Sequence, residues 1–409
     1  MGKMIAIPEL DETATQHGRV EKLLPQWRKL AIYSDLPAGV DFAKLPLITK
    51  ADLRRDFPRN FLPANMDLDA LVAKGDLELE HTSGSSEERT AVLFPRGWWN
   101  QQERQVLSLN GFVASVLAKY PHPRRATIVP PVCNGLVCFN NWTSKSARTV
   151  DGTLFVNQAR IPFLNTEEEM VRMAAEVTGW APQFLDLDPV HGAWFALYCE
   201  RKGIKFPSLQ FILCSYEFVS LVHRNIIERV FGVPVLNFYG STETGHLLME
   251  DDEGMMRALP GNVYYEVINR DERGIGDMII TTLTNEIMPL VRYRVGDLVE
   301  SIENGTAYLV LGRARDVMQR ADGRRVTTLD IDRCFAGVEG IAHYQLRQAE
   351  SGQCHMQYIP DRERPAAATL NELTARIGEV LQLNGTIRVE AVNKLPPLTS
   401  GKFRLTSRV

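Results

Sequence analysis

The sequence contains no apolar run that approaches the roughly 20 residues of a membrane-spanning helix. Its N-terminus starts with a basic residue but soon reaches Glu9, Asp11 and Glu12, so it lacks the long apolar core of a secretory signal. Ala6 stands where a myristoylation pattern needs Ser or Thr. These absences predict a cytoplasmic protein that has no membrane partner.

The chain has no excess of either charge. Lys and Arg number 46 against 50 Asp and Glu, which leaves a formal net charge of -4. This balance gives no support to a nucleic-acid partner, because such proteins present a strongly basic face. A hydrophobic fraction of 44% is that of a globular protein, and 409 residues are too many for one core, so we expect two domains.

Cysteine is scarce, and none of the six cysteines forms a C-x-x-C pair. Cys199 and Cys214 lie in apolar stretches, which favours buried thiols in a reducing compartment. Cys133 and Cys138 are an alternative pair of metal ligands, but no His/Cys cluster completes such a site in the sequence.

Short apolar runs alternate with helical patterns through the middle of the chain. Residues 1–75 read as helices and turns. Buried strands are expected over 126–129, 209–214 and 233–239, with helices over 170–177 and 218–231. Strand, helix and strand at this spacing indicate a largely parallel α/β sheet.

A change of pattern follows residue 275. Strands over 277–282 and 307–311 predict a small β subdomain, and a helix over 369–383 and a strand over 387–392 predict an α+β C-terminal part. The sequence therefore predicts an α/β protein whose large N-terminal domain, 1–313, has mostly parallel sheets. A small mobile C-terminal lid, 314–409, follows it.

The first segment with chemical character is 81–90, His-Thr-Ser-Gly-Ser-Ser-Glu-Glu-Arg-Thr. Small hydroxyl residues around a glycine let the backbone approach phosphate oxygens and offer N–H and O–H donors. A Walker loop is absent from the sequence. The alternative interpretation of this segment is an ordinary surface loop.

The second segment is 237–245, Asn-Phe-Tyr-Gly-Ser-Thr-Glu-Thr-Gly, at a predicted strand end, where open α/β sheets place ligands. Tyr239 offers a flat face to a nucleobase, Thr242 a hydrogen bond to phosphate, and Glu243 a hard oxygen ligand for Mg²⁺. The alternative is a plain turn that Ser241 or Thr242 caps.

Two further segments lie closer to the C-terminus. Asp297, in the run 289–298, is an acceptor for two ribose hydroxyls, and Arg313 follows within reach of ribose or phosphate. Lys402, in the run 395–404, is a mobile point charge that can neutralise a carboxylate and an α-phosphate. Read singly, Asp297 is a turn residue and Lys402 belongs to a solvated tail.

In this order, the four segments resemble the adenylate-forming superfamily of acyl-CoA synthetases, carrier-protein adenylation domains and luciferases. They are most similar to the phenylacetate–CoA ligase-like branch, through Tyr-Gly-Ser-Thr-Glu, Arg-Tyr-Arg-x-Gly-Asp-Leu and Gly-Arg-x-x-Asp, over residues 81–405. The resemblance implies that ATP and Mg²⁺ activate a carboxylic acid as an acyl-adenylate with release of pyrophosphate. It also implies transfer to a thiol, with coenzyme A as the expected acceptor.

The resemblance also implies roles for individual residues. Thr242, Glu243 and Lys402 would be catalytic, and Glu243 would also bind the metal. The expected hinge of the lid falls within 313–316. The cofactor-binding set comprises Thr82, Ser83, Gly84, Ser85, Ser86, Ser215, Glu217, Tyr239, Gly240, Ser241, Asp297 and Arg313.

Two departures from the family pattern stand out. Glu87, Glu88 and Arg89 replace a Gly-Lys-Pro run, which predicts weaker triphosphate binding unless Arg89 compensates. Ser215 and Tyr216 replace a Gly-Gly pair, which predicts a narrower pocket.

The branch favours an aromatic or other compact carboxylic acid as substrate. Trp98 and Trp99 fit either a pocket or the core. The other candidate substrate residues are Asn134, Gly135, Tyr216, Gly245 and His246.

Alternatives stay open at this point. The enzyme can load an acyl-carrier protein or an amine instead of coenzyme A, and a homodimer would cover surface that a short chain exposes. A non-catalytic nucleotide- or acyl-binding protein is the alternative from another class.

Overall fold

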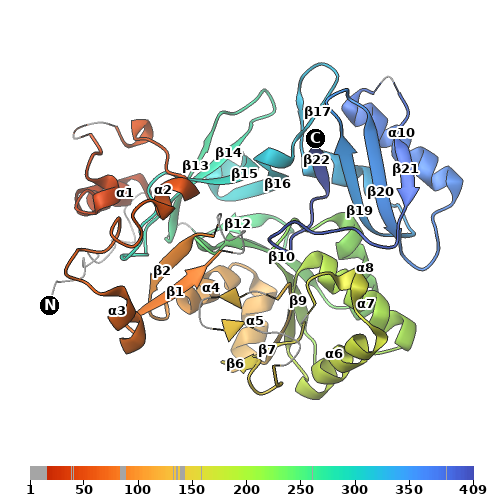
Figure 1. Cartoon of the computed structure of the whole chain (residues 1–409), viewed down its shortest axis with the longest axis horizontal. Helices are drawn as coiled ribbons and strands as arrows, with labels where there is room; N and C mark the ends of the chain where they lie inside the picture. The colour runs from red at the N-terminus through yellow and green to blue at the C-terminus, as the bar shows by residue number, and fades with distance from the viewer. Residues whose placement is uncertain are drawn as a thin grey trace. The chain divides into compact units, whose positions relative to one another are not determined.

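The computed structural model describes residues 16–409 except 38, 40, 83–88, 132, 135, 136, 139–142, 158, 260 and 384. The chain divides into two compact units, and Figure 1 labels the helices and strands of both. Unit 1 comprises 1–111, 133–137 and 239–309, and unit 2 comprises 112–132, 138–238 and 310–409. The predicted division into 1–313 and 314–409 stays a prediction.

Unit 1 is built on antiparallel strands. One pair is β1 (Leu77–His81) with β2 (Ala91–Pro95), and the larger set runs in the order β13-β14-β15-β16-β12-β11. The strands of that set are β11 (Gly245–Glu250), β12 (Met256–Ala258), β13 (Val263–Ile268), β14 (Ile275–Thr282), β15 (Tyr293–Ile302) and β16 (Ala307–Arg313). The helices are α1 (Gln16–Trp27), α2 (Lys50–Arg54), α3 (Leu68–Lys74) and α4 (Trp98–Leu107), with 3₁₀ turns η1 (Ala31–Tyr33), η2 (Phe42–Lys44) and η4 (Glu303–Gly305).

Unit 2 contains the predicted parallel sheet. Its strands lie in the order β10-β9-β8-β3-β7-β6, and neighbours from β10 to β7 are parallel. The strands are β3 (Arg125–Ile128), β6 (Thr149–Val150), β7 (Thr153–Phe155), β8 (Phe184–Leu187), β9 (Phe211–Cys214) and β10 (Val235–Ser241), of which residues 239–241 belong to unit 1. The short strands β4 (Cys133–Asn134) and β5 (Val137–Cys138) form a separate pair, and of their residues 133, 134 and 137 belong to unit 1. The helices are α5 (Gly111–Lys119), α6 (Glu167–Trp180), α7 (Pro189–Lys202) and α8 (Leu221–Phe231), with η3 (Pro162–Leu164). The α/β fold class is confirmed.

The C-terminal segment of unit 2 is α+β, as the sequence predicts. Its main sheet has the order β21-β20-β19-β22. Its elements are η5 (Ala314–Asp316), β17 (Met318–Gln319), β18 (Arg325–Val326), α9 (Thr328–Asp332), η6 (Arg333–Phe335), β19 (Ile341–Gln348), β20 (Cys354–Pro360), α10 (Ala367–Leu381), β21 (Arg388–Ala391) and β22 (Thr406–Arg408).

Helix α6 shows how local sequence sets an element. Thr166 and Glu169 form a capping box at its start, and acidic residues fill its first turn, where the helix dipole favours negative charge. The predicted stripe is confirmed, because Met170, Met173, Ala174 and Val177 are all buried.

Polar contacts fasten the C-terminal segment to α8 within unit 2. Asp332 accepts hydrogen bonds from Ser220 Oγ at 2.5 Å and from the N–H of Leu221 at 2.9 Å. Nearby, His223 Nε2 of α8 lies 3.0 Å from His343 Nδ1 of β19, and both rings are almost fully buried. Because burial disfavours the charged imidazolium, the pKa of His223 falls to about 4, although Asp188 opposes the shift. Burial also lowers the pKa of His343, and the neighbouring His223 lowers it further.

This histidine pair predicts acid sensitivity. Between the ordinary histidine value of 6.5 and about 4, an unfolded His223 binds a proton that the folded one does not. The free energy of unfolding therefore decreases as pH falls through this window, by up to about 1.4 kcal/mol per pH unit for one proton. We expect His223→Gln to flatten the slope by about that amount in urea unfolding between pH 6.5 and 5. His122→Gln, at an exposed position, should leave the slope unchanged, and an unchanged slope in His223→Gln would contradict the assignment.

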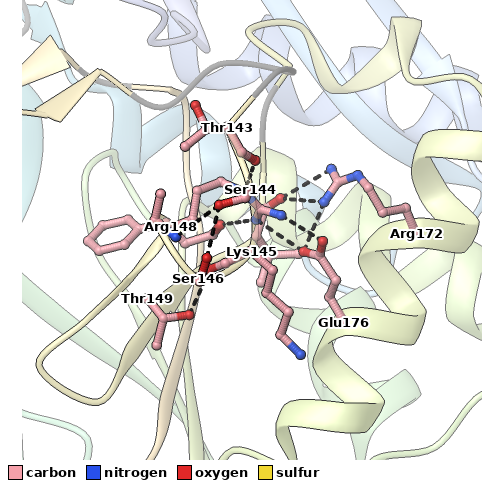
Figure 2. Close-up of polar contacts among 11 residues, drawn as sticks. Thr143, Ser144, Lys145, Ser146, Arg148, Thr149, Arg172 and Glu176 are labelled. Carbon is pink, nitrogen blue, oxygen red and sulfur yellow. Dashed lines mark hydrogen bonds and ion pairs between the residues drawn. The ribbon is translucent and has the colours of Figure 1, made fainter.

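A buried arginine holds the edge of the parallel sheet (Figure 2). The Arg148 side chain is 2% exposed, and its two terminal nitrogens reach Glu176 of α6 at 3.1 and 2.6 Å. It also donates to the carbonyl of Thr143 at 3.1 Å and to that of Phe155 at 2.5 Å. Arg172 adds a second cation at 2.9 Å from Glu176. One guanidinium thus ties the turn 143–149 to both β7 and α6.

Four cysteines, at 199, 214, 334 and 354, are buried free thiols, as the sequence predicts for the first two. The side chains of Cys133 and Cys138 lie outside the described residues. In the part of the chain that the structure describes, no helix is long and apolar enough to cross a membrane.

Candidate active site

The turn 242–244 joins β10 to β11 and carries the predicted Thr242 and Glu243. Two glycines allow its close packing. A Cβ on Gly240 would meet the carbonyl oxygen of Gly245 at 2.4 Å, which leaves no room for any side chain. Gly245 has φ +67°, and a Cβ there would meet Gln102 Oε1 at 2.5 Å. Inside the turn, Ser241 Oγ and Thr244 Oγ1 hydrogen-bond at 3.0 Å.

Glu243 is a buried carboxylate with 2% of its surface exposed. Its Oε1 lies 2.5 Å from the ammonium nitrogen of Lys50 and accepts a hydrogen bond from Tyr293 Oη at 3.2 Å. Burial raises the pKa of Glu243, but the charge and hydrogen bond of Lys50 outweigh burial, and the pKa is lowered overall. Glu243 is therefore ionised at neutral pH.

The predictions from sequence missed Lys50. Its helix α2 begins with a capping box of Thr49 and Asp52, so Lys50 stands at the first helical position. A cation is disfavoured there by the helix dipole, so its presence was a signal that another group pairs with it. That group is Glu243.

Tyr239 and Asp297 meet in unit 1, although 58 residues separate them. Tyr239 Oη donates to Asp297 Oδ2 at 2.6 Å, and Asp297 is 5% exposed. Tyr293 and Asp297 both belong to β15, so this strand contacts the end of β10 and the turn after it. The structure therefore brings together the residues that the sequence predicts for the base, the ribose and the metal.

Thr82 lies at the neck of the predicted phosphate loop. Its N–H donates to the carbonyl of Thr90 at 3.0 Å, and its Oγ1 accepts from the N–H of Thr90 at 3.0 Å. The two threonines therefore close the base of the loop. Ser83, Gly84, Ser85 and Ser86 lie outside the described residues, together with Glu87 and Glu88.

His246 packs in unit 1 against Trp99, with ring centroids 4.9 Å apart. Gln102 Nε2 donates to the carbonyl oxygens of Thr244 at 3.1 Å and His246 at 2.8 Å, which fastens the turn to α4. Trp98 is 6% exposed and stacks on Phe94, so it belongs to the core. The candidate substrate residue Gly135 and the side chain of Asn134 lie outside the described residues.

Ser215 and Tyr216 follow β9 in unit 2. Ser215 Oγ donates to Asp186 Oδ1 at 2.8 Å, so it supports the strand end. Tyr216 has φ +71°, in the left-handed region that favours glycine, and is 40% exposed. A tyrosine is strained here, which accords with the Gly-Gly pair of the family pattern.

Lys402 and Glu217 lie close to each other in unit 2. Glu217 Oε1 accepts a hydrogen bond from the N–H of Phe403, the residue after Lys402, at 2.8 Å. Burial and then Asp188 raise the pKa of Glu217 well above its usual value, while Lys402 acts in the opposite direction. Arg313, the last residue of β16, is partly buried. The roles assigned to Lys402, Glu217 and Arg313 stay predictions.

The chain is similar in sequence to one protein family and to two curated proteins. Residues 318–408 match the family model described as the CapK C-terminal domain. Over 192 residues, 44% of this chain, the sequence is 24% identical to Protein CapK of Staphylococcus aureus, of which 42% is covered. Over 197 residues, 43% of this chain, it is 24% identical to phenylacetate-coenzyme A ligase of Thermus thermophilus, of which 44% is covered. The chain thus spans less than half the length of these curated relatives.

A solved structure extends the likeness to almost the whole chain. 2-Hydroxyisobutyryl-CoA ligase, in the postadenylation state in complex with 2-HIB-AMP, superposes with a TM-score of 0.67 and 14% identity. The match covers 96% of this chain and 88% of that one. At this identity the likeness shows the fold, and the chain has the fold of the acyl-CoA ligases. The resemblance to the adenylate-forming superfamily is confirmed.

Proposed function

We propose that this chain, which has the fold of the adenylate-forming acyl-CoA ligases and a CapK-type C-terminal segment, uses ATP to activate a carboxylic acid as an acyl-adenylate. The observation that carries the proposal is the convergence of Tyr239, Asp297 and Glu243 in unit 1. An aromatic face for the base, a carboxylate for the ribose hydroxyls and an ionised carboxylate for the magnesium ion suit a nucleoside triphosphate bound with Mg²⁺. The 2-HIB-AMP in the structural neighbour supports the same chemistry.

The residues divide the work of the first step. Tyr239 would face the adenine, Asp297 would accept from the ribose, and Thr242 would donate to phosphate. Lys402 would neutralise the negative charge as the carboxylate attacks the α-phosphate and pyrophosphate leaves. Positioning and charge neutralisation carry such a step, with little covalent participation by the protein.

Glu243 fits Mg²⁺ as a single protein ligand. Among the described residues, no group of three His, Cys, Asp or Glu side chains is arranged to hold a metal. Mg²⁺ is commonly bound through one or two carboxylates together with phosphate oxygens and water. Glu243 Oε1 is already paired with Lys50, so a cation that uses this atom competes with that ammonium. When bound, the ion would offset phosphate charge.

A purified-protein assay tests the adenylation step. We expect pyrophosphate release and acid-dependent ATP–pyrophosphate exchange with at least one member of a panel of aromatic and compact aliphatic acids. Binding of ATP in calorimetry without turnover on the whole panel would overturn the proposal in favour of a non-catalytic nucleotide-binding protein.

Coenzyme A is our proposed acceptor, on the strength of the phenylacetate-coenzyme A ligase relative. Incubation with the accepted acid, ATP and coenzyme A should yield the acyl-CoA, identified by its mass. Acyl-adenylate that accumulates in the presence of coenzyme A would instead point to a carrier protein or an amine.

The ribose role of Asp297 is testable with a matched pair of variants. Asp297→Asn keeps the shape and an acceptor for Tyr239, but it loses the charge that strengthens hydrogen bonds to two hydroxyls. Such bonds contribute about 1.5–3 kcal/mol, so we expect the Kd for ATP to rise about 10- to 100-fold in calorimetry. Tyr239→Phe keeps the ring and should weaken binding less than 10-fold. Unchanged ATP affinity in Asp297→Asn would exclude the ribose role.

A further inference from the structure

The Lys402 loop is a compact turn in unit 2. The N–H of Leu398 donates to the carbonyl of Lys402 at 2.7 Å, and the N–H of Gly401 donates back to Leu398 at 2.9 Å. These bonds fix the shape of the turn but do not attach it to its surroundings. Arg160 Nη2 donates to the carbonyl of Leu398 at 3.3 Å, and Phe403, the residue that follows Lys402, attaches the other end of the turn to unit 2.

The Phe403 side chain packs against aromatic rings of unit 2. Its ring is 8% exposed and lies 5.5 Å from Phe163 and 5.1 Å from His343, measured between ring centroids. The backbone N–H of Phe403 donates to Glu217 Oε1 at 2.8 Å. This hydrogen bond joins the first amide after Lys402 to the end of β9.

Asp188 is a neighbour of Glu217 and is fully buried. Asp188 Oδ1 accepts from the N–H groups of Val190 and His191 and lies 3.0 Å from His191 Nδ1. Asp188 Oδ2 is buried and has no hydrogen-bond donor among the described residues. The carboxyl of Glu217 lies against Asp188. Two carboxyls in contact share a proton, because both cannot be ionised in a buried site.

The directions of the two pKa shifts assign this proton to Glu217. Burial raises the pKa of Asp188, but His191 outweighs burial, and the pKa is lowered overall. For Glu217 the balance is reversed, since burial and the neighbouring Asp188 both raise its pKa. A protonated Glu217 is able to donate a hydrogen bond to the neighbouring Asp188 carboxylate.

We propose that Glu217 is a positioning residue that seats the Lys402 loop as a neutral carboxylic acid, accepting from Phe403 with one oxygen and donating to Asp188 with the other. The proposal rests on the proposed function only in taking Lys402 as the lysine of adenylation. It replaces the predicted place of Glu217 in the cofactor-binding set with a role that acts through Lys402.

Two substitutions separate this role from its alternatives. Glu217→Gln has the shape of a neutral carboxylic acid, with one acceptor and one donor, so it should behave like the wild type. Glu217→Ala removes the acceptor of Phe403 and the donor to Asp188. Glu168→Gln, at an exposed position in the first turn of α6, is the matched control for loss of a carboxylate.

Digestion with trypsin tests whether Glu217 holds the Lys402 loop, and it does not depend on the enzymatic activity of the protein. Trypsin cleaves after Lys402, and the amide of that bond is the N–H that Glu217 holds. We expect Glu217→Ala to speed cleavage at this bond about 10-fold, as loss of one hydrogen bond to a carboxyl implies, and Glu217→Gln to leave it unchanged. Cleavage after the exposed Lys119, measured by mass in the same digest, is the internal reference for global unfolding.

The half-reactions supply the second test. Glu217→Ala should lower kcat for adenylation about 10-fold with an unchanged KM for ATP, while thioester formation from supplied acyl-adenylate stays at the wild-type rate. A raised KM for ATP with an unchanged kcat would indicate a direct contact between Glu217 and ATP and would overturn the proposal. Glu217→Gln as impaired as Glu217→Ala, or unchanged cleavage in Glu217→Ala, would overturn it as well. If the wild type adenylates no acid but cleavage responds as expected, the proposed function fails while the seating role stands.

Discussion

Lys402→Ala should lower acid-dependent ATP–pyrophosphate exchange at least 100-fold. The ammonium is the mobile cation that we assign to the carboxylate and the α-phosphate as they approach each other. Removal of one group that stabilises developing charge typically lowers kcat about 10²- to 10³-fold. The measurement is exchange at saturating ATP and acid, and thermal unfolding should show a midpoint close to that of the wild type.

Lys394→Ala is the control for this experiment. Lys394 is exposed and lies eight positions earlier in the same C-terminal segment, so it tests whether any lysine there matters. It should retain full exchange. Conversion of supplied acyl-adenylate to thioester should survive in Lys402→Ala, because that step forms no pyrophosphate. Exchange within 10-fold of the wild type in Lys402→Ala would remove Lys402 from the chemistry.

Arg148→Met should destabilise the protein by about 3–5 kcal/mol, the range for breaking a buried ion pair. Among the described residues, the loss leaves Glu176 with Arg172 as its remaining cation, and it takes the guanidinium donor from the carbonyls of Thr143 and Phe155. Methionine fills much of the volume, so the effect reports on the polar contacts. Urea unfolding, followed by circular dichroism, gives the free energy.

Lys145→Met serves as the matched control, since Lys145 lies in the same turn and is exposed, with its side chain directed away from the network (Figure 2). We expect a change within about 0.5 kcal/mol. The double variant with Glu176→Met should be more stable than Arg148→Met alone, because it removes a carboxylate that has lost its buried partner and keeps only the half-buried Arg172. A double variant that is less stable by the full sum of both single losses would contradict this account.

The periodic parts of the fold were predictable from sequence because their signals are local. The stripe at Met170, Met173, Ala174 and Val177 needs only a helical period, and the apolar run that ends at Cys214 needs only a buried strand. Even there, the observed α6 is longer than the predicted 170–177, since its start is set by the cap at Thr166 rather than by the stripe.

The site was predictable in its members but not in its contacts. The motif order assigned Tyr239 and Asp297 to one nucleotide, yet nothing in two segments 58 residues apart fixes the hydrogen bond between them. Lys50 and Asp188 were missed for a similar reason. Each begins or caps a helix, so local sequence explains it fully, and its second role depends on tertiary neighbours.

Gly240 has a consequence for recognising remote relatives. This chain is only 24% identical to Protein CapK over the matched residues and 14% identical to 2-hydroxyisobutyryl-CoA ligase, so most positions differ. At Gly240 the obstacle to substitution is main-chain atoms of Gly245 and His246, which no compensating side-chain change can move aside. A glycine two positions before a Thr-Glu pair at a strand end is therefore a landmark that should outlast overall similarity, and alignments of distant members can be anchored on it.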